Sequence, residues 1–224
     1  MIIAERKPFD EIKQMIKDYP KVLIVGCGTC VAVCLAGGEK EVGILAAELR
    51  MALELEGKKI EIGETTVERQ CDREFLEAIA SQVEQYDAVI SMACGVGVQF
   101  LAEMYPEKPV FPAVNTTFLG ANEDIGFYTE RCSACSTCYL ALTGGICPVT
   151  MCSKGLLNGP CGGPVNGMCE VDRTRPCAWC QIYERLKQQG RLDLLKGVVP
   201  AREFKTKPAQ FIHPAYKKKF ERPQ

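Results

Sequence analysis

Nine cysteines lie between residues 129 and 180, among many glycines and four prolines. This segment has few long apolar runs, so it cannot bury an ordinary hydrophobic core. It therefore needs disulfides or bound metal to hold its fold. It therefore constrains the fold more than any other stretch of the chain. The nine residues are Cys132, Cys135, Cys138, Cys147, Cys152, Cys161, Cys169, Cys177 and Cys180.

The start of the chain indicates whether these cysteines form disulfides or bind metal. Residues 1–22 are amphipathic and charged, which is not typical of a signal peptide. No run of about 18 apolar residues follows, so we expect no membrane span and a cytoplasmic protein. Cytoplasmic thiols stay reduced, and dense cysteines there bind metal more often than they form disulfides. The net charge of −1 gives no argument for nucleic acid as a partner.

The spacing C-x2-C-x2-C at Cys132, Cys135 and Cys138 favours iron–sulfur chemistry. Two-residue gaps let successive thiolates curl around one cluster while backbone amides point at its sulfides. In bacterial ferredoxins a Cys-Pro follows after three residues, whereas here Cys147-Pro148 follows after eight. The tract is therefore not a plain ferredoxin repeat. Zinc is the rival metal, because the pair Cys177/Cys180 has the spacing of four-cysteine zinc sites.

The first 125 or so residues alternate between strand and helix patterns. This alternation predicts an α/β fold, a small Rossmann-like parallel sheet with flanking helices. Continuous apolar runs such as KVLIVG are typical of strands buried on both faces. We expect strands over residues 21–26, 58–67, 87–93 and 108–116. We expect helices over residues 8–19, 39–56, 73–86 and 96–105.

Five further cysteines lie at or near the ends of these strands. Cys27 follows the first strand directly, Cys94 follows the third, and Cys71 comes shortly after the second. The carboxyl ends of parallel strands share one edge, where ligands bind. Cys30 and Cys34 would face the same side of a helix that began near Cys27. We therefore expect a second metal site at this edge, built from these five residues.

Other functional signals are weak. Gly26 and Gly28 give G-x-G, but Val31 occupies the third glycine position of a dinucleotide fingerprint. The single histidine, His213, leaves little from which to build an acid–base or Cys/His catalytic pair. We expect no catalytic residues in this chain.

Three parts follow from these patterns: an α/β domain over 1–128, a cysteine-rich, loop-rich iron–sulfur domain over 129–200, and a basic tail over 201–224. A helix is expected over residues 178–195 at the end of the second part. The tail is interpreted either as a frayed surface segment or as an arm that lies on a partner protein.

The motifs GCGTCVAVCLAGGEKEV, SMACGVGVQ and CSACSTCYLALTGGICPVTMCSKGLLNGPCGG resemble a known family. This is the MetV family, the small iron–sulfur subunit of acetogen-type methylenetetrahydrofolate reductase. Its carboxyl-terminal part is called the methylenetetrahydrofolate reductase C-terminal domain. The resemblance runs from about Lys21 to about Leu194, and the long cysteine-spaced string is its specific part.

The resemblance implies an electron-transfer subunit of an oxidoreductase complex. Its partner would be a flavin-containing methylenetetrahydrofolate reductase catalytic subunit, and a further redox protein would donate electrons. The partner reduces 5,10-methylenetetrahydrofolate to 5-methyltetrahydrofolate in the reductive acetyl-CoA (Wood–Ljungdahl) pathway. All fourteen cysteines are candidate ligands of two or three [4Fe–4S] clusters, with zinc at one site as an alternative. The competing hypotheses are a zinc-stabilised interaction module and a self-contained reductase that binds NAD(P)H.

Overall fold

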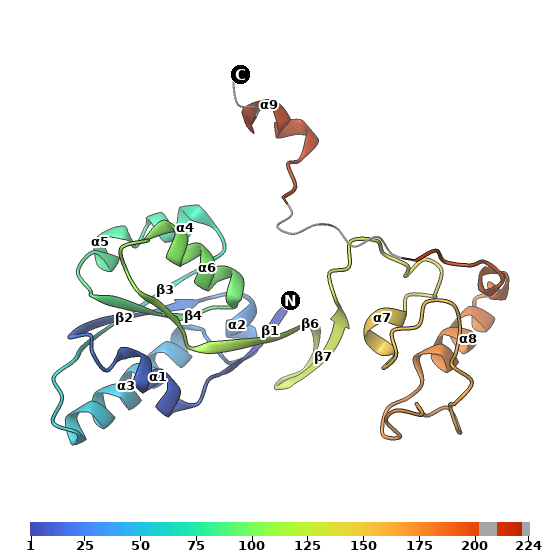
Figure 1. Cartoon of the computed structure of the whole chain (residues 1–224), viewed down its shortest axis with the longest axis horizontal. Helices are drawn as coiled ribbons and strands as arrows, with labels where there is room; N and C mark the ends of the chain where they lie inside the picture. The colour runs from blue at the N-terminus through green and yellow to red at the C-terminus, as the bar shows by residue number, and fades with distance from the viewer. Residues whose placement is uncertain (202–209, 221–224) are drawn as a thin grey trace.

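The computed structural model describes residues 1–201 and 210–220. Its amino-terminal part contains a sheet of four parallel strands in the order β3-β2-β4-β5 (Figure 1). The strands are β2 (Lys21–Cys27), β3 (Glu61–Val67), β4 (Ala88–Met92) and β5 (Val110–Pro112). The predicted α/β class with a parallel sheet is therefore confirmed.

Helices cover both faces of this sheet (Figure 1). On one face, α1 (Phe9–Ile16) and α3 (Glu39–Leu55) pack on Val22 and Ile24 of β2. On the other, α4 (Arg73–Glu77), α5 (Ala80–Val83) and α6 (Gly95–Met104) pack on Leu23 and Val25. Alternate residues of β2 thus bury into opposite cores, which explains why its sequence is apolar without interruption.

A second, antiparallel sheet was not predicted. It consists of β1 (Ile2–Arg6), β6 (Val114–Asp124) and β7 (Phe127–Cys132) in the order β1-β6-β7. The strand predicted over 108–116 is wrong as a single element, because its residues divide between the two sheets at Ala113. The Ala113 N–H donates to the Ser91 carbonyl at 2.9 Å, while its own carbonyl accepts from the Lys7 N–H at 2.9 Å.

Two predicted helices are also shorter than expected. The helix predicted over 73–86 is interrupted at Ala78 and Ile79, and nothing in the structure explains the break. The helix predicted over 178–195 is α8 (Ala178–Gln188), followed by a 3₁₀ turn at Leu192–Lys196. Gly190, with φ +65°, ends α8. The N–H groups of Gly190 and Arg191 donate to the carbonyls of Lys187 and Leu186, which is a Schellman cap.

The cysteine-rich part contains few regular elements. Besides α8 it has only one short α-helix in its described residues, α7 (Pro148–Met151). Its small core joins Trp179, Ile182 and Leu186 of α8 to Cys177. The predicted boundary at 128/129 falls within β7, so the β6–β7 hairpin leads directly from one part to the other (Figure 1).

The predicted tail lies partly outside the described residues, which omit 202–209 and 221–224. The described segment ends in a 3₁₀ turn at Pro214–Tyr216 and α9 (Lys217–Phe220). No helix in the described parts of the chain combines the length and the apolar character needed to cross a membrane.

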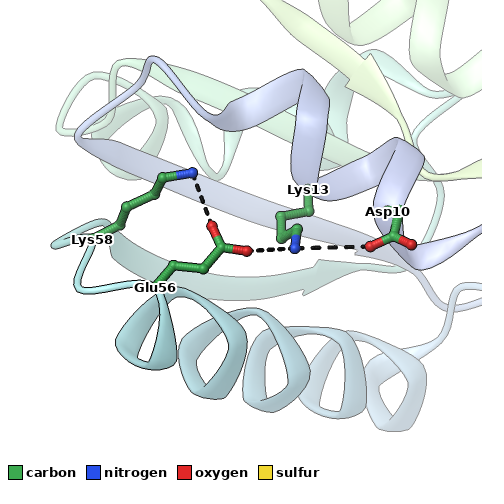
Figure 2. Close-up of polar contacts among 4 residues, drawn as sticks. All are labelled: Asp10, Lys13, Glu56 and Lys58. Atoms are coloured by element: carbon green, nitrogen blue, oxygen red, sulfur yellow. Dashed lines mark hydrogen bonds and ion pairs between the residues drawn. The ribbon is translucent and has the colours of Figure 1, made fainter.

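A cluster of charged side chains joins α1 to the end of α3 (Figure 2). The Lys13 ammonium lies 2.6 Å from Glu56 and 3.8 Å from Asp10, and Lys58 lies 2.9 Å from Glu56. Hydrogen bonds from Lys13 and Lys58 lower the pKa of the Glu56 carboxyl to about 2. The carboxylate is therefore stabilised in the folded chain, although solvent screens the interaction.

Replacing Glu56 by glutamine is expected to cause a small loss of stability at neutral pH. A carboxyl whose pKa falls from 4.5 to about 2 on folding stabilises the chain above pH 4.5, and the effect fades as pH falls towards 2. Urea unfolding of wild type and Glu56→Gln at falling pH measures this convergence. The control is Glu54→Gln, an exposed residue of α3 with no ion pair in the described part of the chain. A difference that stays constant down to about pH 3 would contradict the linkage.

Candidate metal centres

The carboxyl edge of the parallel sheet brings four cysteines together. Cys27 ends β2, Cys71 lies in the loop after β3, Cys94 precedes α6, and Cys30 begins the short helix α2 (Cys30–Val33). Partial burial raises the pKa of the Cys71 thiol, and the charges of Cys27, Cys94 and Cys30 raise it further. These four cysteines all lie at the ends of neighbouring strands or in the segments that follow them. We call them the strand-end site.

Cys34 makes different contacts from these four. Its Sγ accepts a hydrogen bond from the Ala4 N–H at 3.4 Å and lies 3.4 Å from the Ala4 carbonyl and 3.5 Å from that of Val31. Burial raises the pKa of this thiol. The helix expected to begin near Cys27 begins at Cys30 and ends at Val33, so Cys34 lies beyond it and contacts β1.

The tract at Cys132, Cys135 and Cys138 is a tight loop after β7. Ala134 and Ser136, between these cysteines, have φ of +49° and +70°, a conformation that side chains disfavour. The Ala134 N–H points at the Cys132 Sγ, 3.4 Å away. Alternation of right- and left-handed residues aims backbone N–H groups at one point, as in many iron–sulfur sites.

The helix α7, which begins directly after Cys147, packs on the strand that leads into this tract. This helix packs on β7, and the Thr150 hydroxyl donates to the Arg131 carbonyl at 3.2 Å. Arg131 precedes Cys132, and Cys147 is the residue before α7. The loop that separates these two cysteines in sequence therefore returns to the same strand. We call Cys132, Cys135, Cys138 and Cys147 the hairpin-end group.

Four more cysteines, Cys152, Cys161, Cys169 and Cys177, line one small cavity beside Trp179. We call them the cavity site. The Cys169 thiol donates to the Ser153 hydroxyl at 3.5 Å. When Cys169 is ionised, the same hydroxyl and the backbone N–H groups of Asp172 and Val171 donate to its sulfur, which lowers the pKa of Cys169. Lys154 and Glu170 form an ion pair and also line the cavity.

Cys180 lies one turn along α8 from Cys177. Partial burial raises the pKa of its thiol, and a hydrogen bond with Cys177 and the charge of Cys161 raise it further. It also lines a separate, larger cavity of about 1050 Å³ with Tyr183 and Leu194. Cys180 is thus next to the cavity site in sequence, but it lines the larger cavity instead.

The donor set fits thiolate-ligated metals. All fourteen cysteines are free. Across residues 1–201 and 210–220, however, no three Cys, His, Asp or Glu side chains are close enough to surround one ion. A tetrahedral zinc ion with Zn–S of about 2.3 Å needs its sulfurs about 3.8 Å apart.

The antiparallel sheet contacts the strand-end site and leads to the hairpin-end group. The Tyr128 hydroxyl of β7 donates to the Val33 carbonyl at the end of α2, at 2.8 Å. Thr116 of β6 accepts from the Gly95 N–H, next to Cys94, at 2.9 Å. Since β7 ends at Cys132, one hairpin fixes loops of the first site and carries the first ligand candidate of the second.

Sequence reasoning missed the polar residues that support these groups. Gln70 and Ser91 are wholly buried beside the strand-end site and hydrogen bond to each other. The available signal was a serine within the apolar run AVISMA and a glutamine directly before Cys71. Tyr128 and Thr116 carried no such signal, because their partners are distant in sequence.

Comparison with known proteins gives one match. No curated protein and no solved structure matches this chain. Residues 111–205 match the family model described as "Methylene-tetrahydrofolate reductase C terminal". The match covers strands β6 and β7 and all nine cysteines of the cysteine-rich part. It relates this segment of the chain to the methylenetetrahydrofolate reductase family.

Proposed function

We propose that this chain is the electron-transfer iron–sulfur subunit of a methylenetetrahydrofolate reductase complex. It passes electrons to the flavin of a catalytic subunit that reduces 5,10-methylenetetrahydrofolate to 5-methyltetrahydrofolate, in the reductive acetyl-CoA pathway. The observation that carries this proposal is the strand-end site, where the fold places four cysteines from three distant segments at one edge of the parallel sheet. The family match of residues 111–205 supports the link to the reductase.

The grouping of the thiols supports a division into three clusters. The strand-end site would hold one through Cys27, Cys30, Cys71 and Cys94. The cavity site would hold a second through Cys152, Cys161, Cys169 and Cys177. The hairpin-end group would hold a third through Cys132, Cys135, Cys138 and Cys147. Bound clusters supply one-electron transfer, and the protein sets their spacing and shielding.

Two cysteines remain outside this division. The Cys34 thiol is engaged with Ala4 and Val31 backbone groups, which leaves it a packing role. Cys180 borders the larger cavity and competes with Cys177 for the cavity site. The C-x2-C spacing of Cys177 and Cys180 also favours the alternative at this site, since such pairs bind structural zinc.

The test of the proposal is electron transfer to a flavin. The full chain is purified without oxygen, reduced with dithionite and freed of excess reductant. It is then mixed with the oxidised flavin-bearing methylenetetrahydrofolate reductase subunit of the same organism. We expect the flavin absorbance to bleach while the clusters reoxidise. NADH added to the chain alone should reduce nothing.

Two outcomes would contradict the proposal. Clusters that stay reduced beside an oxidised flavin would remove the electron-transfer role. Reduction of the isolated chain by NADH would favour a self-contained reductase.

A further inference from the structure

Gln70 is a wholly buried amide within the α/β domain. Its Nε2 donates to the Val25 carbonyl at 2.8 Å and to the Gly26 carbonyl at 3.1 Å. Its Oε1 accepts from the Ser91 hydroxyl at 2.7 Å. Both N–H groups and the carbonyl of the amide are therefore used, and Ser91 is wholly buried as well.

These contacts tie together three cysteine-bearing segments. Gln70 directly precedes Cys71, Val25 and Gly26 lead into Cys27, and Ser91 lies on β4 three residues before Cys94. Cys71 itself is exposed, so the buried anchor of this loop beside it is Gln70. One side chain thus sets where Cys71 stands relative to the ends of β2 and β4.

Packing around Gln70 is tight. A Cβ on Gly97 would come within 2.8 Å of the Gln70 Cβ and 2.7 Å of the Ala93 Cβ. Gly97 lies in the first turn of α6, just after Cys94. The absence of a side chain at Gly97 lets α6 approach Gln70, so the segment that follows Cys94 also packs against this residue.

We propose that Gln70 is a positioning residue of the strand-end site, which holds the Cys71 loop on β2 and β4 and so fixes the spacing of the thiolates. This proposal rests on the proposed function, because it requires a cluster at that site. An amide is needed here, since it offers two N–H donors and one acceptor from a single neutral group. A carboxylate could not donate to the two carbonyls, and burying its charge would be costly.

The test compares full-length chains purified without oxygen: wild type, Gln70→Met, Ser91→Ala and Cys71→Ala. The control is Gln85→Met, an exposed glutamine of the same domain whose amide bonds only the Ser81 carbonyl in the described structure. Iron content and the paramagnetic resonance spectrum of the reduced chain are measured, with circular dichroism to establish folding. The signal missing from Cys71→Ala identifies the strand-end cluster.

We expect Gln70→Met to lose or shift this one signal while the others stay unchanged, with a loss of up to about four iron. Gln85→Met should match wild type. If Gln70→Met does not fold, Ser91→Ala provides the test of the proposal, because it removes one hydrogen bond and leaves the amide in place. A shifted strand-end signal in Ser91→Ala then supports the proposal. If wild type contains iron and the folded variants give the same signals as wild type, the Gln70 proposal alone is overturned. A wild-type chain without iron would overturn the proposed function with it.

Discussion

A chain in which alanine replaces Cys71 is expected to lose about four iron atoms, the content of one [4Fe–4S] cluster. A chain in which serine replaces Cys34 should keep all its iron. The two cysteines belong to the same half of the chain and were equal candidates by sequence. Their surroundings differ, because Cys71 lies near three other thiols, while Cys34 contacts the backbone of β1.

The chemistry of each substitution makes this comparison sharp. Alanine at the exposed Cys71 removes a thiolate without leaving a large cavity. Serine at Cys34 keeps a donor and an acceptor for the Ala4 N–H and carbonyl, so the contact with β1 can persist. Iron and acid-labile sulfide per chain, measured on protein purified without oxygen, give the result. Equal iron in wild type and Cys71→Ala, or a matching loss in Cys34→Ser, would contradict the proposed ligand set.

Replacing Gly37 by alanine is expected to lower the free energy of unfolding by about 3 kcal/mol or more. A Cβ at this position would lie 1.9 Å from the Met92 carbonyl oxygen and 2.9 Å from its carbonyl carbon. Backbone atoms cannot turn aside as a flexible side chain does, so β4 would have to shift. Gly37 also accepts a hydrogen bond from the Cys27 N–H at 2.9 Å, which carries the disturbance into the strand-end site.

Gly43 provides the matched control for this substitution. It lies within α3, and the only atom near an added Cβ is the Glu64 Oε2 at 3.7 Å. Alanine there should stabilise the helix by about 0.5–1 kcal/mol. Urea unfolding followed by circular dichroism measures both variants. A Gly37→Ala chain within about 1 kcal/mol of wild type would show that the end of β4 can move freely.

The parallel sheet could be predicted because its strands are buried on both faces. β2 and β4 are short, mainly apolar runs. Cys27 ends the first and Cys94 follows the second by two residues, so the sheet edge and its cysteines could be inferred from order along the chain. The antiparallel sheet could not be predicted in the same way. β1 pairs with β6, whose residues follow more than a hundred positions later, and most of β6 is only half-buried or exposed.

The spacing of the cysteines in the sequence could not predict which of them the fold groups together. Cys30 and Cys34 are four residues apart, which predicts one helical face, but α2 is a single turn and ends before Cys34. In the cysteine-rich part, Cys152 and Cys177 meet at one cavity because loops rich in glycine fold back, and no periodicity encodes that return. The ligand role of the C-x2-C-x2-C tract stays a prediction, and the structure adds the positive φ of Ala134 and Ser136 between its cysteines.

The most direct test of the central claim is the metal content and paramagnetic resonance of the full chain prepared without oxygen. If all three cysteine groups hold clusters, we expect about 12 iron per chain, and about 8 if two of them do, with signals that appear on reduction by dithionite. Fewer than about 3 iron, with about 1–2 zinc in their place, would contradict the account and leave a zinc-stabilised scaffold.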